Sequence, residues 1–425
     1  VVVVGKTENG NASATLYRNE GDGSFTSLNE NLTGVVEGTA DFADADGDAE
    51  LDLLITGTGA DGTPTATLYE NDGSGDFSKS GAGLTGVKES SADWGDVNGD
   101  GVPDLVITGK TDSEPASTTL YENDGSGNFT PASSGLLKVA GGTSRFGDYN
   151  DDGELDLLIA GDGSGEARLY ENDGSGSFTS RSYYGYQGEF GPNATSADWA
   201  DIDGDGDLDL LILDGDYSRS ATIYRNEGFG NFQVVKDGLG ITKGGTGSVR
   251  FEDVNGDGKP DAIVAGSGVA RVYLNGGNGD TFERANWGLT EIYSGAMAVG
   301  DLELDGDNDL AVVGNDNLDG ASARLYVNRR VQNQSPGERP EYMRPAPDTT
   351  IAAGLTYSYT IEAGDPEGDK LEYRIYPSTS GISISPLGSG AARLTFSPSR
   401  DDGGTSPFVS AYVSDDGLYS TREIG

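Results

Sequence analysis

The sequence predicts an all-β protein, a seven-bladed β-propeller with a C-terminal β-sandwich domain. Three observations support this fold class. A nine-residue acidic segment occurs six times, with starts 52, 52, 53, 52 and 48 residues apart. Between its copies a hairpin-like sequence of the type LYENDGSGNF recurs, and short β-branched runs such as LDLLIT follow the acidic segments. Residues 1–330 show no helical periodicity, so a repeat of about 50 residues indicates propeller blades.

Each repeat predicts four short strands, A to D. Strand A precedes the acidic segment, strand B follows it, strand C carries the LYxN sequence, and strand D follows the Gly-rich turn. The N-D-G-S-G residues suit a tight hairpin turn, which pairs C with D. Seven copies of strand C against six acidic segments indicate that the first and last blades are incomplete and that one further loop precedes residue 1. A β-solenoid is the competing fold, but it requires shorter and more uniform coils.

The chain divides into three predicted regions. Residues 1–330 form the propeller, and residues 331–349, which include four Pro, form an extended linker. Residues 350–425 contain alternating runs such as LTYSYTIEA (355–363) and KLEYRIY (370–376), which predict a small β-sandwich. Its segments 365–373 and 413–417 resemble cadherin-like and bacterial immunoglobulin-like modules. The last strand should continue beyond TREIG, so we expect this module to be truncated.

Composition excludes several classes of function. The chain has 27 Lys plus Arg against 71 Asp plus Glu, a net charge of -44, and neither His nor Cys. Catalysis by Ser-His or Cys-His pairs, the common zinc sites and disulfides are therefore excluded. A polyanion of this kind is repelled by nucleic acid and by anionic membrane surfaces, and we expect neither nucleic-acid binding nor membrane insertion. The acidic excess favours a secreted, halophilic protein, and no signal peptide is visible.

The acidic segments are predicted calcium loops. Oxygen ligands at positions 1, 3, 5 and 9, with the backbone carbonyl of position 7, can surround one hard cation, and Gly at position 6 permits the reversal. Position 7 varies from Val to Lys, which only a carbonyl ligand tolerates. We therefore expect about six Ca²⁺ sites with the following ligands: Asp44, Asp46, Asp48, Glu50, Asp52; Asp96, Asn98, Asp100, Val102, Asp104; Asp148, Asn150, Asp152, Glu154, Asp156; Asp201, Asp203, Asp205, Asp207, Asp209; Asp253, Asn255, Asp257, Lys259, Asp261; Asp301, Glu303, Asp305, Asp307, Asp309.

These repeats resemble the FG-GAP and VCBS repeats of the integrin α-subunit propeller and its bacterial relatives. The resemblance rests on Phe146-Gly147, on the D-x-D-x-D-G-x-x-D loops and on the LYxNDGSGxF hairpins, and it covers about 330 residues. It implies a calcium-binding propeller. Two loops depart from the pattern, because Ala49 replaces the loop Gly and Glu303 replaces a short Asp or Asn.

A ligand surface is predicted on the propeller face opposite the calcium loops. That face carries the B–C and D–A connections, and the longest D–A segment, 181–195, concentrates the candidate ligand-binding residues Arg181, Tyr183, Tyr184 and Tyr186. Exposed Tyr and Arg are favoured in binding sites for sugars and proteins. The alternative is that these Tyr side chains only cover the outer strand.

The predicted function is that of a non-catalytic, calcium-stabilised adhesion or recognition protein of the extracellular space or cell surface. A protein or a glycan is the expected partner, and self-assembly is a further possibility. Two alternatives stay open: a structural subunit of an extracellular filament or surface layer, and a polysaccharide lyase or glycosidase. The enzyme is disfavoured because most acid pairs are committed to the calcium loops.

Overall fold

The computed structural model describes the chain apart from residues 8, 21–24, 29–30, 133–134, 163–166, 182–193, 215–220, 240–246, 267, 286, 288, 290, 303–307, 317–319, 328–340, 346–356, 365–371, 377–381, 389–390, 397–408, 416–417 and 425. Beyond residue 326 it describes backbone alone. All regular secondary structure in the described residues is β. No helix among them has the length and apolar character needed to cross a membrane.

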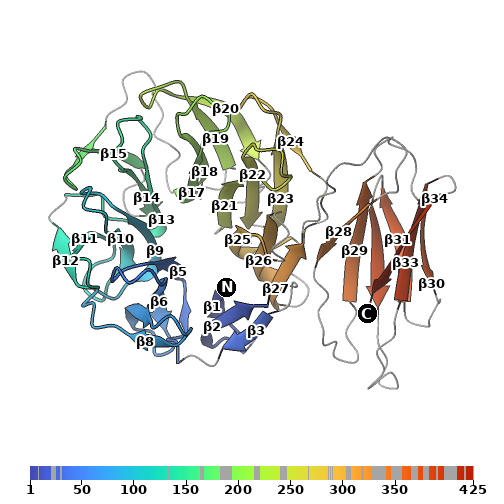
Figure 1. Cartoon of the computed structure of the whole chain (residues 1–425), viewed down its shortest axis with the longest axis horizontal. Helices are drawn as coiled ribbons and strands as arrows, with labels where there is room; N and C mark the ends of the chain where they lie inside the picture. The colour runs from blue at the N-terminus through green and yellow to red at the C-terminus, as the bar shows by residue number, and fades with distance from the viewer. Residues whose placement is uncertain are drawn as a thin grey trace.

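Five complete four-stranded blades follow one another around a ring (Figure 1). Each blade is an antiparallel meander from strand A to strand D. The blades are β5 (Ala40–Ala43), β6 (Asp52–Gly59), β7 (Pro64–Asn71) and β8 (Phe77–Lys79); β9 (Lys88–Gly95), β10 (Asp104–Lys110), β11 (Ser117–Asn123) and β12 (Phe129–Ala132); β13 (Ala140–Gly147), β14 (Asp156–Asp162), β15 (Arg168–Asn172) and β16 (Phe178–Ser180); β17 (Ala194–Ala200), β18 (Asp209–Asp214), β19 (Ala221–Asn226) and β20 (Phe232–Leu239); β21 (Gly247–Glu252), β22 (Asp261–Gly266), β23 (Val269–Asn275) and β24 (Phe282–Arg284).

The predicted all-β propeller is confirmed, but the predicted count of seven blades is wrong, because five blades are complete. Two smaller units flank them. The first contains β1 (Val2–Lys6), β2 (Ala12–Asn19) and β3 (Phe25–Leu28), and β4 (Val35–Val36) joins it to β6. The last contains β25 (Ser294–Gly300), β26 (Asp309–Asp316) and β27 (Gly320–Val327). Its sequence lacks the Phe that closes the other hairpins, and β28 (Glu341–Pro345) pairs with the outer edge of β27 instead.

The strands after the propeller pair in two sheets. β28 continues to β29 (Tyr357–Gly364), β32 (Ala391–Phe396) and β31 (Ile382–Gly388). The second sheet joins β30 (Glu372–Tyr376), β33 (Val409–Asp415) and β34 (Leu418–Ile424). β28 falls inside the predicted linker 331–349. The proposed immunoglobulin-like or cadherin-like identity of this region stays a prediction, as do the three domain boundaries.

The repeat sequence determines where strands begin and end. In each complete blade strand B begins at the last Asp of the acidic segment, as at Asp104, and strand C ends at the Asn of LYxN, as at Asn123. The hairpin closes where that Asn pairs with the following Phe, for example Asn123 with Phe129. The predicted C–D hairpins are therefore confirmed in the described blades.

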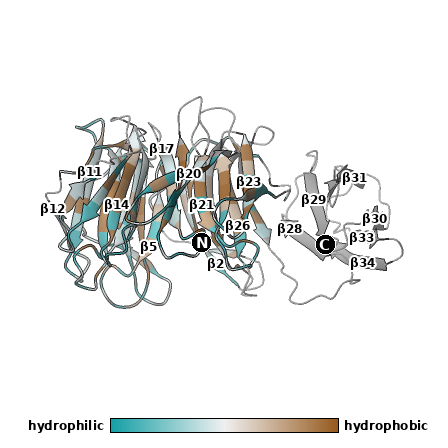
Figure 2. Cartoon of the chain, turned by 90° about the horizontal axis from the view of Figure 1, so that it is seen from above, coloured by the Kyte–Doolittle hydropathy of each residue, from teal (hydrophilic) through white to brown (hydrophobic). Residues whose placement is uncertain are grey.

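The hydrophobic core lies between neighbouring blades. Side chains of strands B and C from one blade pack against those of the next: Leu54 and Leu68 lie in one cluster with Leu105, Ile107 and Tyr121. Hydrophobic residues gather in the strands of the sheets, while the described connections at their ends are mostly hydrophilic (Figure 2). A fully buried Leu or Ile contributes roughly 1.5 to 3 kcal/mol, so stacking against a neighbour provides stability that no blade has alone.

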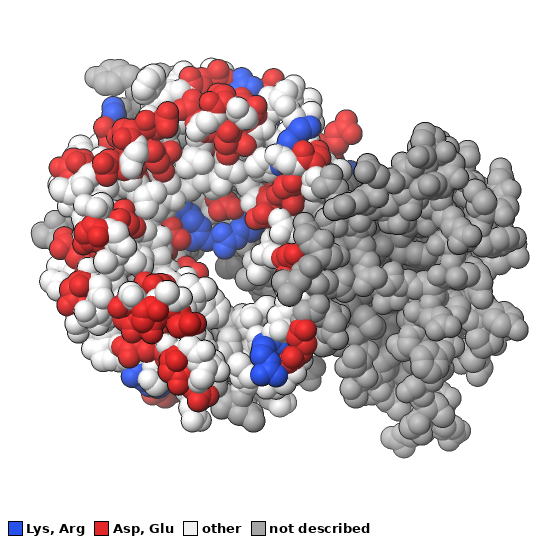
Figure 3. Space-filling model, viewed as in Figure 1, with Lys and Arg blue, Asp and Glu red and all other residues white. Residues whose placement is uncertain are grey.

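Charged side chains of the innermost strands link neighbouring blades. Asp93 of β9 accepts a hydrogen bond from the backbone N of Phe146 at 2.7 Å and lies 3.5 Å from the Arg145 guanidinium. Asp198 of β17 makes the same contacts with Phe251 N, at 2.8 Å, and with Arg250. Burial raises the pKa of Asp93 to about 6, although Arg145 opposes the rise. Figure 3 shows Lys and Arg side chains in the hollow at the centre of a face on which acidic side chains predominate.

A ladder of Asn side chains connects each blade to the preceding loop. The amide Nδ2 of Asn172 donates to Val97 O of the preceding blade at 2.8 Å and to Leu155 O of its own blade at 3.0 Å. Asn123, Asn226 and Asn275 repeat this pattern. Asn19 of the first unit donates to Leu302 O of the last unit at 2.8 Å, so the ladder also joins the two ends of the ring.

We expect Asn172→Ala to lower the free energy of unfolding by about 2 to 4 kcal/mol, because it leaves buried carbonyl and amide groups without partners. Asn71→Ala is the matched control, since among the described residues Asn71 Nδ2 donates only to Leu51 O of its own blade, at 3.1 Å. Urea unfolding of both variants measures the difference. Equal losses in the two variants would contradict a specific role for the contact between blades.

Candidate functional site

Each acidic segment folds into a tight loop closed by its own side chains. In loop 96–104 the first Asp accepts hydrogen bonds from the backbone N of Gly99, at 2.8 Å, and of Gly101, at 2.8 Å. Asn98 accepts one from Asp100 N at 2.9 Å, and Asp100 accepts one from Val102 N at 3.0 Å. Loops 44–52, 148–156, 201–209 and 253–261 repeat most of these bonds, so five loops share one conformation.

The last Asp of each loop is buried at the start of strand B. In loop 201–209, Asp209 accepts hydrogen bonds from Ile202 N, at 2.8 Å, and from Asn226 N, at 2.7 Å. This carboxylate therefore fixes both the start of the loop and the end of strand C. Burial raises the pKa of Asp209 to about 7, and the neighbouring carboxylates Asp203 and Asp205 add to the rise.

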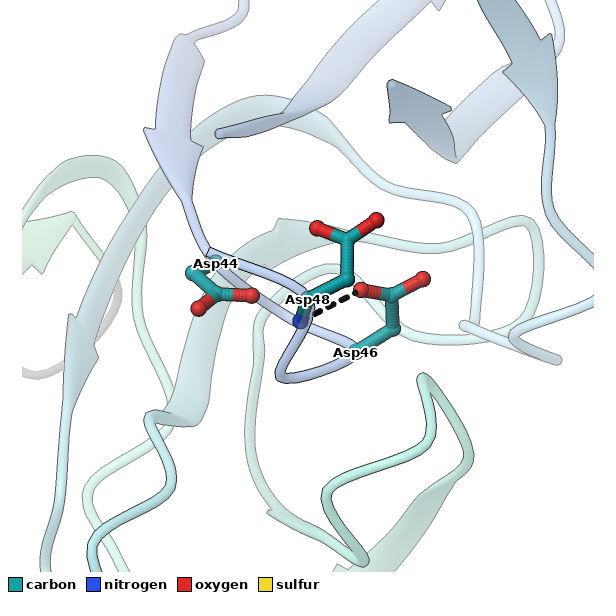
Figure 4. A group of neighbouring side chains, drawn as sticks. All are labelled: Asp44, Asp46 and Asp48. Atoms are coloured by element: carbon teal, nitrogen blue, oxygen red, sulfur yellow. Dashed lines mark hydrogen bonds between the residues drawn. The ribbon is translucent and has the colours of Figure 1, made fainter. Parts of the chain in front are cut away.

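The loops bring carboxylate oxygens together. One oxygen from each of Asp44, Asp46 and Asp48 lies within 4.8 Å of the others, and the same holds for Asp201, Asp203 and Asp209. Figure 4 shows the first group on a single turn of chain, with Asp48 N donating to Asp46 at 3.3 Å. Groups of hard oxygen ligands with no His or Cys suit Ca²⁺.

A carboxylate oxygen in loop 201–209 lacks a hydrogen-bond partner. Asp203 Oδ1 is buried and accepts no hydrogen bond from the described residues. Leaving such an atom without a donor or cation is costly, so the donor set of this loop matches a divalent cation.

Side chains at position 7 lie against the turn between strands C and D, and Lys259 also approaches its own loop, with Nζ 3.8 Å from Asp257 Oδ2. An ideal Cβ on Gly73 would lie 3.2 Å from Glu50, one on Gly125 would lie 3.2 Å from Val102, and Lys259 lies against Gly277 in the same way. These glycines belong to the turn between strands C and D, so the loops and turns of a blade are in contact. The backbone carbonyl of position 7 stays the predicted ligand.

Several predicted residues lie outside the described part of the chain. These are Glu303, Asp305 and Asp307 of the sixth loop and the ligand candidates Tyr183, Tyr184 and Tyr186. In the sixth loop, Asp309 accepts a hydrogen bond from Leu302 N at 2.6 Å, as in the other loops. Arg181 is described and forms an ion pair with Glu171.

Two residues near loop 201–209 were not predicted from the sequence. Arg225 replaces the Glu of LYEN, and its Nε lies 3.7 Å from Asp203. Phe229 replaces a turn Ser, is 88% exposed and has a φ of 52°. The preceding Gly228 adjoins the loop, because its ideal Cβ would lie 3.7 Å from Asp207. Both substitutions are visible when the repeats are aligned with one another, so such an alignment can identify these two residues from the sequence.

The chain belongs to the family of FG-GAP-like repeat proteins. The family model matches residues 44–107, 96–159, 148–212, 201–264 and 253–312, and each match begins at the first Asp of an acidic loop. A comparison with curated proteins finds no match.

Two solved structures are similar in fold. One is an Agrocybe aegerita lectin described as recognising non-reducing terminal N-acetylglucosamine, with 19% identity, a TM-score of 0.53, and coverage of 77% of this chain and 86% of that chain. The other is a Penicillium chrysogenum alpha-L-arabinanase complexed with arabinobiose, with 12% identity, a TM-score of 0.40, and coverage of 76% and 97%. At 19% identity the similarity to the lectin concerns the fold alone, and the lower TM-score of the arabinanase supports no conclusion about this chain.

We expect Ala49→Gly to stabilise the protein by about 0.5 to 1 kcal/mol, because Ala49 has a φ of 73° where the other described loops have Gly. The reverse change, Gly101→Ala, is the control, since Gly101 has a φ of 86° and nothing lies within 4 Å of its ideal Cβ. Backbone strain alone should then destabilise that variant. If denaturant unfolding finds Gly101→Ala neutral, the strain argument is wrong.

Proposed function

We propose that this chain is a non-catalytic, calcium-stabilised recognition protein of the extracellular space or the cell surface, and that its ligand is a glycan. The observation that carries the calcium part is the repetition of one preformed carboxylate loop in every complete blade. A single acidic turn is common on protein surfaces. Five copies with the same hydrogen bonds, at the same edge of five blades, support a shared ligand.

Calcium would be held by the oxygens of positions 1, 3, 5 and 9 and by the carbonyl of position 7. It would supply positive charge where the net charge is -44 and where burial raises the pKa of Asp209 and Asp156 to about 7. Because the last Asp also holds strands B and C, a cation there would join the loop to the blade.

The non-catalytic part of the proposal rests on how the described carboxylates are used. The loop Asp residues accept backbone hydrogen bonds, and Asp93 and Asp198 bind both a backbone N–H and an Arg. Carboxylates held in this way are poorly placed for the paired acid and base roles of glycoside hydrolysis.

Chelation should lower the melting temperature in one cooperative step. A ligand present at 100 times its Kd stabilises the folded state by about 2.7 kcal/mol per site, and the Asn ladder couples neighbouring loops. Thermal unfolding followed by circular dichroism, in Ca²⁺ and then in chelator, measures the effect, with Mg²⁺ as the control cation. Identical melting curves in Ca²⁺ and chelator would overturn the calcium part.

Phe229 supports recognition of a glycan. An aromatic side chain that is 88% exposed and sits at positive φ contributes nothing evident to the core, and its backbone conformation costs roughly 1 kcal/mol. Aromatic faces stack on the apolar faces of sugars, and an uncharged sugar avoids repulsion by the acidic surface.

We expect Phe229→Ser to abolish binding to a panel of neutral glycans while leaving the melting temperature unchanged or slightly raised. Ser is the matched residue, because Ser74, Ser126 and Ser175 hold this position in other blades, without positive φ. A parallel variant with Tyr183, Tyr184 and Tyr186 changed to Ala tests the opposite face. Loss of binding only in the triple variant would assign the ligand to that face.

The same panel distinguishes the alternatives. Release of shortened or unsaturated sugars would show that the protein is an enzyme. If no glycan binds while the calcium-loaded fold is intact, the glycan part of the proposal is wrong.

A further inference from the structure

The third residue of the LYxN sequence lies beside position 3 of the calcium loop in its own blade. Two blades show this directly. An ideal Cβ on Gly127, in the turn of the following blade, would lie 3.5 Å from Glu70 Oε1 and 3.7 Å from Asp46 Cβ. An ideal Cβ on Gly279 would lie 2.9 Å from Asp203 Cβ and 3.5 Å from Arg225 Cδ. The two arrangements are equivalent, but the side chain beside the loop is anionic in one blade and cationic in the other.

Arg225 connects three acidic groups. Its Nε lies 3.7 Å from Asp203 Oδ2 and donates to Glu227 Oε1 at 2.9 Å, and its guanidinium forms a further ion pair with Asp280. Asp280 belongs to the turn between β23 and β24 in the next blade. The side chains of Arg225 and Asp203 are 20% and 17% exposed, so solvent screens the contact between them less than a contact at the surface. Loop 201–209 therefore has a cation of its own, and that cation is tied to the neighbouring blade.

This cation has two consequences for the loop. It neutralises part of the charge of Asp203, which would otherwise repel Asp201 and Asp205 when no metal is present. It also repels a second cation entering the same oxygens. The first effect stabilises the metal-free loop, and the second weakens metal binding.

We propose that Arg225 is a built-in counter-charge that stabilises loop 201–209 without metal and lowers its affinity for Ca²⁺. The inference rests on the proposed calcium binding. It predicts that loop 201–209 binds Ca²⁺ at a higher concentration than it would if residue 225 were Glu, like the equivalent Glu70. The five loops then do not act as identical sites.

The test is a calcium titration of the full chain by isothermal calorimetry, together with melting temperatures in chelator and in Ca²⁺. Arg225→Gln should raise the Ca²⁺ affinity of one site about 3- to 10-fold. In chelator the variant should melt at a lower temperature than the wild type. In Ca²⁺ the difference between the two melting temperatures should become smaller or change sign. Arg225→Lys keeps the positive charge and should retain the weaker calcium affinity. This variant provides a second test of the charge effect if Arg225→Gln folds poorly.

Arg18→Gln is the matched control. Arg18 occupies the same position in β2 and pairs with Glu20 as Arg225 pairs with Glu227, but its described ion pair involves no loop carboxylate. It should leave the calcium isotherm unchanged. A merely structural role for Arg225 would lower the melting temperature equally in chelator and in Ca²⁺.

The outcomes separate the two proposals. If the wild type binds calcium and Arg225→Gln leaves the affinity unchanged or weakens it, this inference alone is overturned. A wild-type chain that binds no calcium would overturn the proposed function, and this inference with it.

Discussion

The arrangement of the blades depends on one pair of side chains, the last Asp of each acidic loop and the Asn that ends strand C. Asp209 accepts the backbone N–H groups of Ile202 and Asn226, and Asn226 donates to Tyr149 O in the preceding blade at 2.7 Å. The loop, the blade and the neighbouring blade thus share one buried hydrogen-bond network. Its members have no access to water, so loss of one leaves the others unsatisfied. Geometry at each loop is therefore fixed by residues of two blades.

Burying a carboxylate at this point is costly, and the other carboxylates of the loop add to that cost. Asp104, Asp156, Asp209 and Asp261 are all fully buried, and burial is the largest cause of their raised pKa values. Backbone N–H groups offset part of this cost, and a cation bound by the same loop would offset more. The hydrogen-bond network and the proposed metal sites therefore share a residue. The Asp that joins strands B and C also supplies an oxygen to the loop.

Local features of the fold could be predicted from the sequence, whereas contacts across the ring could not. The repeat spacing, the Gly-rich turns and the β-branched runs are local, and they determine the strand order within a blade. Between successive blades the Asn ladder joins residues 73 to 78 apart, at the two ends of the ring it joins residues 283 apart, and the Asp93–Arg145 pair joins residues 52 apart. Nothing local indicates that such residues meet. The seven-blade prediction counted copies of strand C, but a complete blade also needs its strand A and strand D.

Functional differences between blades should arise where the shared network does not constrain the side chain. The residues that close the loops and hairpins barely vary among the repeats, because each has a hydrogen-bond partner in its own or the preceding blade. The third residue of LYxN and the turn Ser lie outside this network, so Glu can become Arg225 and Ser can become Phe229 without loss of the fold. Both changes occur in the blade β17–β20, beside the loop where Asp203 Oδ1 is buried without a hydrogen-bond partner among the described residues, as Asp156 Oδ2 is in loop 148–156. The blade β17–β20 thus combines a cation beside its loop with an exposed aromatic side chain, so a change in its metal affinity and a change in recognition can be tested in the same blade.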